Sequence, residues 1–129
     1  MIDIQALLRG MMEKNASDLH MRVGGPPVYR VNGQLYRLNM DRLSAEDMDQ
    51  VFSDLANEHQ RQHFVDTFEL DMSVGLSGVG RFRVNAFRQR GTISLAIRSI
   101  KTDVPRFEAL NLPEIILDIA MRKRGLVLV

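Results

Sequence analysis

Residues 80 to 100 read GRFRVNAFRQRGTISLAIRSI, and this stretch predicts two long strands joined by a tight turn at Arg90-Gly91. Glycine supplies the positive φ that such a turn needs, and both flanks alternate apolar with polar residues. The apolar face of the predicted pair carries Phe82, Val84, Ala86, Ile93, Leu95 and Ile97. The other face carries Arg81, Arg83, Asn85, Ser94 and Arg98. The stretch therefore predicts an antiparallel hairpin with one apolar face and one basic face.

The turn also predicts the register of this hairpin. With Gln89 opposite Thr92, counting back along both strands sets Arg83 directly opposite Arg98. Like charges in opposed positions destabilise a strand pair by something on the order of a few tenths of a kcal/mol. We therefore interpret the arginine pair as a candidate anion site. The alternative is that both arginines are ordinary solvated residues on the open face of a sheet.

Length and composition describe one ordinary domain. The chain has 129 residues, of which 45% are hydrophobic, and this is enough for a core without covalent staples. It contains no cysteine, which excludes a disulfide framework and a thiolate metal site. Its 17 basic and 16 acidic residues give a net charge of +1, which argues against a broadly basic nucleic-acid binder.

The sequence gives no indication of membrane insertion. It has no run of about 18 apolar residues. Its first residues, MIDIQALLRGMMEKN, indicate an amphipathic helix and not a signal peptide. We expect the protein to be cytoplasmic.

The remaining pattern predicts an α+β domain, an antiparallel sheet with helices packed on one face. Apolar spacing and capping residues predict helices over 2–14, after Ser44 and over 57–68. Alternation and turn residues predict further strands over 17–23, 28–31, 34–38 and 69–74.

Two local patterns indicate metal or phosphate chemistry only weakly. His59 and His63 are four residues apart on a predicted helix, but no third ligand is near, so we predict no metal site. The glycine-rich segment Gly75–Gly80 leads into a strand, whereas phosphate-binding loops usually lead into a helix. We interpret its glycines as turn formers.

The sequence changes character after Lys101. Proline and asparagine at 105, 111 and 113 predict a linker, which is followed by a short helix over 114–121. Residues Leu126–Val129 form a continuous apolar run, which is typical of a strand buried on both faces of a parallel sheet. Because this strand has no parallel partner in the sequence, we expect it to belong to a second, missing domain.

Several motifs, taken in order, resemble the N-terminal portion of the type IV pilus retraction ATPases of the PilT/PilU type, which drive twitching motility. They are ASDLH at 16–20, GGPP at 24–27, RVNG at 30–33, GRFRVNAF at 80–87 and RGLVLV at 124–129. Residues 120–125 look more like the PilU branch than the PilT branch. The resemblance implies a PAS-like domain over 1–103, a linker over 104–113 and the start of a RecA-like ATPase domain over 114–129.

The resemblance also implies a division of chemistry. In this family the strand that matches Leu126–Val129 is followed at once by the Walker A loop. The sequence contains no G-x-x-x-x-G-K-[ST], so we expect that this fragment is not itself an enzyme and holds no cofactor. ATP and Mg²⁺ would belong to the full-length parent, an ATP hydrolase.

Within such a motor, the N-terminal domain mediates subunit contacts and supplies arginines from its last hairpin to ATP bound by the C-terminal domain. The matching positions are Arg83 and Arg98, which are candidate arginine fingers, with Arg81 as a weaker nucleotide-binding candidate. Asp18 and His20 belong to the family signature, and we expect them to order their strand and not to be catalytic.

The partners implied by the resemblance are five further copies in a homo-hexamer, the inner-membrane platform protein of the pilus and a sister retraction ATPase. The implied location is the cytoplasm, peripheral to the inner membrane. Neither nucleic acid nor membrane insertion is expected.

Two other functions remain open from the residues. A PAS-like sheet with a helix across it often encloses a small ligand, although the sequence has no Cys, Trp or cofactor-binding constellation. A nucleic-acid-binding module would use Arg81, Arg83, Arg88, Arg90 and Arg98. Base stacking needs aromatic residues among these arginines, and Phe87 is the one candidate on their face.

Overall fold

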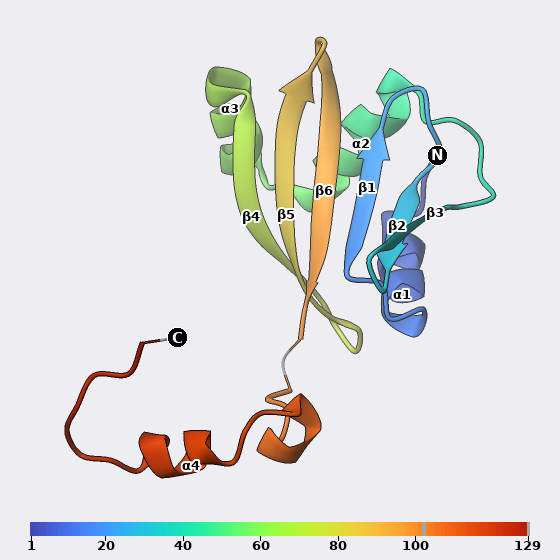
Figure 1. The fold of residues 1–129 in the computed structure, drawn as a ribbon. Helices are drawn as coiled ribbons and strands as arrows, with labels where there is room; N and C mark the ends of the chain where they lie inside the picture. Colours follow the sequence, from blue (N-terminus) through green and yellow to red (C-terminus); the bar gives the residue numbers. More distant parts are fainter. Residues whose placement is uncertain (102, 129) are drawn as a thin grey trace.

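The computed structural model describes residues 1–101 and 103–128. Its centre is a six-stranded antiparallel sheet with the strand order β3-β2-β1-β6-β5-β4 (Figure 1). The strands are β1 (Asp18–Arg22), β2 (Val28–Val31), β3 (Gln34–Arg37), β4 (Glu69–Leu76), β5 (Gly80–Gln89) and β6 (Thr92–Ile100). The helices are α1 (Ile4–Glu13), α2 (Ala45–Leu55), α3 (Glu58–Thr67), the 3-10 helix η1 (Phe107–Leu110) and α4 (Ile115–Ala120).

The hairpin of β5 and β6 has the predicted register. Gln89 lies opposite Thr92, and Arg83 lies opposite Arg98. Arg90 and Gly91 have φ values of 51° and 81°, the positive values that a type I′ turn requires. The predicted apolar face is buried throughout, with Phe82 and Val84 fully inaccessible to solvent. Local pattern therefore predicted this hairpin correctly.

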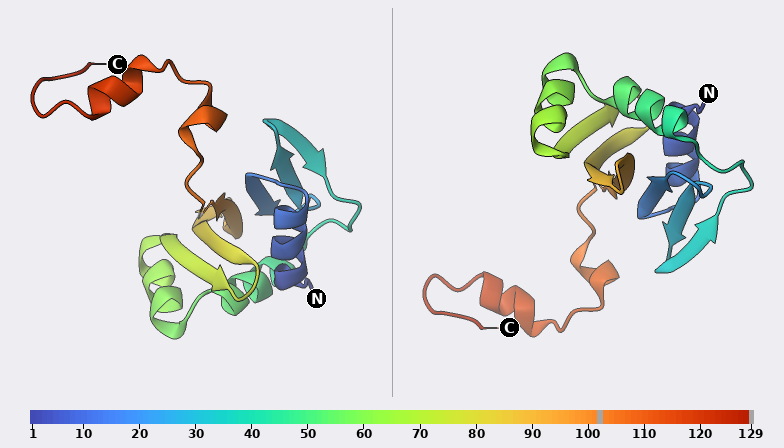
Figure 2. Two further views of the ribbon diagram at one scale, coloured as in Figure 1. Left: turned by 90° about the horizontal axis from the view of Figure 1, so that it is seen from below. Right: turned by 90° about the horizontal axis from the view of Figure 1, so that it is seen from above.

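Helices α1, α2 and α3 cover one face of the sheet, as predicted, and leave the opposite face open (Figure 2). The buried stripe of α1 consists of Ile4, Leu7, Leu8 and Met11. Ser44 and Asp47 form a reciprocal capping box at the start of α2, and Asn57 and Gln60 form another at the start of α3. These caps satisfy backbone N–H groups that the first turn of a helix leaves unpaired.

The sheet joins two sequential groups of strands through β1 and β6. Strands β1, β2 and β3 follow one another in the chain, as do β4, β5 and β6, and β1 pairs with β6 between the two groups. This pairing sets Asp18 directly opposite Arg98. It brings together two segments that are 80 residues apart in the sequence.

Two details of the prediction were wrong. Strand β4 continues to Leu76, so the glycine-rich turn is shorter than the predicted segment 75–80. Residues 126–128 form no strand, and Leu126 and Leu128 are 83% and 84% exposed. A strand needs a neighbouring strand to pair its backbone groups, and the six-stranded sheet does not extend to these residues. Val129, the last residue of the predicted strand, lies outside the described residues.

Residues 103–128 extend away from the sheet (Figures 1 and 2). They contain η1 and α4, and neither helix buries a residue. Among the residues that the structure describes, no helix has the length and apolar character to cross a membrane.

Candidate anion-binding site on the open face of the sheet

The open face carries a row of four charged side chains. Cross-strand pairing places Arg30 of β2, Asp18 of β1, Arg98 of β6 and Arg83 of β5 side by side. Directly opposed residues of a sheet point to the same face, so all four project from the side that the helices leave uncovered. We call this set, Arg30, Asp18, Arg98 and Arg83, the charged row.

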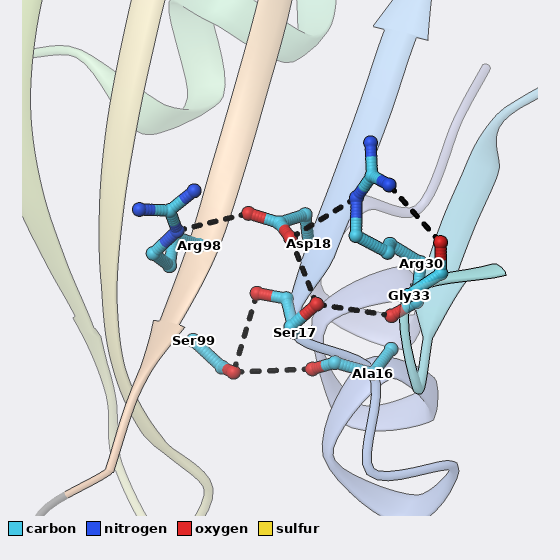
Figure 3. Close-up of polar contacts among 7 residues, drawn as sticks. All are labelled: Ala16, Ser17, Asp18, Arg30, Gly33, Arg98 and Ser99. Carbon is cyan, nitrogen blue, oxygen red and sulfur yellow. Dashed lines mark hydrogen bonds and ion pairs between the residues drawn. The ribbon is translucent and has the colours of Figure 1, made fainter. Parts of the chain in front are cut away.

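Asp18 is the buried member of the charged row, with 8% of its surface exposed. Its Oδ1 accepts a hydrogen bond of 2.9 Å from Nε of Arg98, and its Oδ2 accepts one of 2.8 Å from Oγ of Ser17 (Figure 3). Nε of Arg30 lies 3.5 Å from the same Oδ2. Burial raises the pKa of this carboxyl, but the hydrogen bonds from Ser17 and Arg98 and the nearby positive charge outweigh burial and hold the pKa below its usual value.

Arg98 has most of its guanidinium available for a ligand. Its side chain is 72% exposed, and its Nε is the nitrogen that binds Asp18. Its two Nη groups have no hydrogen-bond partner among the described residues, and Figure 3 shows the dashed contact to Asp18 on Nε alone. These groups are charged donors of the kind that bind phosphate or carboxylate oxygens.

More of the Arg83 guanidinium than of the Arg98 guanidinium is bound by a carboxylate. Its Nε donates to both carboxylate oxygens of Asp71, each at 3.0 Å, and its Nη2 also contacts Oδ2 of Asp71. The hydrogen bond from Arg83 lowers the pKa of Asp71, and the positive charge of Arg83 acts in the same direction. Nη1 of Arg83 has no partner among the described residues and is its remaining donor group.

These carboxylates change the interpretation of the opposed arginine pair. Arg83 and Arg98 each have an acidic partner within the chain, so their repulsion is offset without an external anion. Sequence reasoning missed Asp71 as a partner. It treated Asp18 only as a residue that orders its strand, because the pairing of β1 with β6 has no local signal.

The other candidate arginines do not join the row. Arg81 is on the same face as Arg83 but two cross-strand pairs further along, opposite Ile100. The guanidinium of Arg88 stacks over the ring of Phe68, 5.1 Å from its centroid. Among the described residues, no group of three or more His, Cys, Asp or Glu side chains is arranged to hold a metal ion.

Comparisons with known proteins extend over nearly the whole chain. No protein-family model matches it. The chain is 39% identical over 127 residues to the type IV pilus ATPase PilU of Pseudomonas aeruginosa, which covers 98% of the chain and 33% of PilU. It is 38% identical over 128 residues to the pilus retraction ATPase PilT of the same organism, with 99% of the chain and 37% of PilT covered. The chain is homologous to the PilT/PilU pilus ATPases.

Solved structures agree with this homology. The crystal structure of the pilus retraction motor PilT with bound ADP matches with a TM-score of 0.81 and 36% identity, over 97% of the chain and 37% of PilT. The ATPase DotB of Legionella pneumophila matches with a TM-score of 0.77 and 25% identity, over 95% of the chain and 35% of DotB. The PilT/PilU-like chain thus spans about a third of the length of these relatives.

Proposed function

We propose that this chain serves as the N-terminal domain of a pilus retraction motor ATPase and presents Arg98 and Arg83 to ATP that a C-terminal domain binds. The observation that carries the proposal is the exposed pair of Nη groups on Arg98, directly across the strand pair from Arg83. Its context supports the proposal, since the chain is homologous to pilus ATPases and similar in fold to a PilT that binds ADP.

The chemistry of guanidinium suits this role. It remains protonated near neutral pH and offers forked N–H groups that match phosphate oxygens. The oxygens of a γ-phosphate at the charged row would accept hydrogen bonds from Nη1 and Nη2 of Arg98 and from Nη1 of Arg83. In other phosphoryl-transfer enzymes, an arginine that stabilises the transition-state charge accelerates the reaction by roughly a thousandfold or more.

The proposed organisation divides the protein into an N-terminal domain over 1–103, a linker over 104–113 and the start of the ATPase domain over 114–129. The exposed apolar residues beyond the sheet support this division. They are Val104, Leu110, Leu112, Ile115, Leu117, Met121, Leu126, Val127 and Leu128. Burying such side chains is favourable, so we propose that a RecA-like ATPase domain covers them.

The wider assignment belongs to the same proposal. The full-length protein would be a homo-hexameric ATP hydrolase that uses Mg²⁺ and works in the cytoplasm beside the inner membrane. Its N-terminal domains would contact neighbouring subunits, and its other partners would be the pilus platform protein and a sister retraction ATPase.

The test is the ATPase activity of the full-length motor with Arg98→Ala or Arg83→Ala. We expect both variants to assemble and to lose most of their activity, by roughly a thousandfold for a transition-state contact. Arg37→Ala is the matched control, because Arg37 is an exposed arginine on the outer strand β3. Hydrolysis at the parent rate by both row variants would overturn the proposal.

A further inference from the structure

We infer that Asp18 is a positioning residue for Arg98: it holds the guanidinium through Nε alone and so leaves both Nη groups of this exposed side chain free to bind an anion. This inference rests on the proposed role of Arg98 as a phosphate ligand. It assigns a function to a carboxylate that touches neither the nucleotide nor the reacting atoms.

The backbone around Asp18 is fixed on both sides. Asp18 lies opposite Arg30 in β2 and opposite Arg98 in β6, so neighbours on both flanks hold its strand. The N–H of Ser17 donates to the carbonyl of Arg30 at 2.8 Å, and the N–H of Ser99 donates to the carbonyl of Ser17 at 3.1 Å. The backbone that carries the carboxylate is therefore held in place by both neighbouring strands.

The two carboxylate oxygens of Asp18 bind different partners. Oδ2 accepts a hydrogen bond of 2.8 Å from Oγ of Ser17 and lies 3.5 Å from Nε of Arg30. These two contacts orient the carboxylate. Oδ1 is then directed at Nε of Arg98 at 2.9 Å. Because this side-chain carboxylate is only 11% exposed, water has little access to compete for Oδ1.

The position of the contact on the guanidinium explains its effect. A carboxylate that binds Nε restrains rotation of the planar group and leaves four of the five arginine N–H donors unused. Arg83 shows the alternative, since Asp71 takes both Nε and Nη2. Arg98 is thus oriented and still available, whereas Arg83 is largely occupied.

Charge and positioning predict opposite effects for the loss of Asp18. Removing this carboxylate makes the charged row more positive, which by Coulomb attraction alone would strengthen anion binding. Loss of positioning releases a long, 72% exposed side chain into many rotamers and weakens the site. The sign of the effect therefore separates the two roles.

The direct test is the Nε–H signal of Arg98 in nuclear magnetic resonance spectra of this chain. We expect slow hydrogen exchange in the parent, and exchange faster by roughly tenfold or more in Asp18→Asn and Asp18→Ala, because a charge-assisted hydrogen bond is lost. Asp49→Asn is the matched control, because Asp49 is an exposed carboxylate on α2 that makes no hydrogen bond or ion pair with the charged row. Unchanged exchange in both Asp18 variants would overturn the inference.

The functional test uses the full-length motor. We expect Asp18→Asn to lower kcat by roughly tenfold to a hundredfold, as expected for a misplaced catalytic group, with a smaller change in KM for ATP. Asp18→Asn preserves the side-chain shape, and a melting temperature near that of the parent shows that the protein is folded.

The outcomes distinguish the inference from the proposed function. If Arg98→Ala hydrolyses ATP at the parent rate, the proposed function fails, and the Nε–H exchange still decides whether Asp18 positions Arg98. If Arg98→Ala is impaired while folded Asp18→Asn has the parent kcat or a higher one, the proposed function stands and the positioning role fails.

Discussion

Asp18 and Arg98 form a 2.9 Å hydrogen bond across the pairing of β1 with β6, although 80 residues separate them in the sequence. The pair lies at the junction between the first three strands and the last three. We therefore expect the Asp18–Arg98 pair to affect the stability of the folded sheet as well as the charged row. Its role can be tested by measuring both stability and activity.

The first prediction concerns acid stability. The pKa of Asp18 is lowered in the folded state, where Arg98, Arg30 and His20 face its carboxylate. Its contribution to stability should be present above the unfolded pKa of about 4 and lost as pH falls through the lower pKa of the folded state. In Asp18→Asn, the free energy of unfolding should therefore fall less steeply as the pH is lowered than it does in the parent. The measurement is urea denaturation between about pH 2 and 7. An acid limb as steep as that of the parent would contradict this.

The second prediction concerns the contribution of the Arg83–Asp71 ion pair to stability. Arg83 and Asp71 have side chains that are 68% and 44% exposed, so solvent screens their attraction. A double-mutant cycle with Arg83→Gln and Asp71→Asn should give a coupling free energy below about 1 kcal/mol in urea unfolding. A larger coupling would mean that this pair is more rigid and less solvated than its exposure indicates.

The third prediction concerns the core under the hairpin. Phe82 is fully buried, so Phe82→Ala should reduce the free energy of unfolding by about 3–5 kcal/mol through lost burial and the resulting cavity. Leu35 on β3 is 58% exposed and is the control, because its truncation leaves no cavity. Equal losses in Phe82→Ala and Leu35→Ala would refute the assigned packing.

The fourth prediction concerns the turn. Gly91 has a φ of 81°, and a Cβ added to it would meet nothing within 4 Å, so the effect of Gly91→Ala is purely conformational. We expect a cost of about 1 kcal/mol or more and a lower melting temperature. Gly75→Ala is the control, since its site is equally open and its φ is not in the left-handed region. A greater destabilisation by Gly75→Ala than by Gly91→Ala would contradict the turn geometry.

Much of the fold was predictable where the signal is local. The Arg90-Gly91 turn and the alternating flanks predicted the faces and register of β5 and β6. Ser44 with Asp47 predicted the start of α2 because a capping box involves residues only three apart. The ordered motifs also predicted homology to pilus ATPases, which the comparisons confirm.

The strand predicted over Leu126–Val129 is absent from the described residues 126–128, because its signal was not sufficient on its own. An apolar run indicates that a segment prefers burial, but strand formation also needs a neighbour that supplies backbone partners. The described residues 126–128 have no such neighbour and are exposed. The structure that this apolar run adopts therefore depends on contacts outside the segment, and its place in a second domain stays a prediction.

By itself, the sequence determined the hairpin, its register and the opposed arginines Arg83 and Arg98, because turn chemistry and side-chain alternation act between residues close in the chain. Only the tertiary structure decided that Asp18 meets Arg98 and that the contact is made by Nε, which leaves the two Nη groups of Arg98 without a partner among the described residues. That arrangement depends on β1 pairing with β6. Leu19 and Met21 of β1 are buried in the same core as Leu95 and Ile97 of β6, and no local pattern encodes which strand becomes the neighbour.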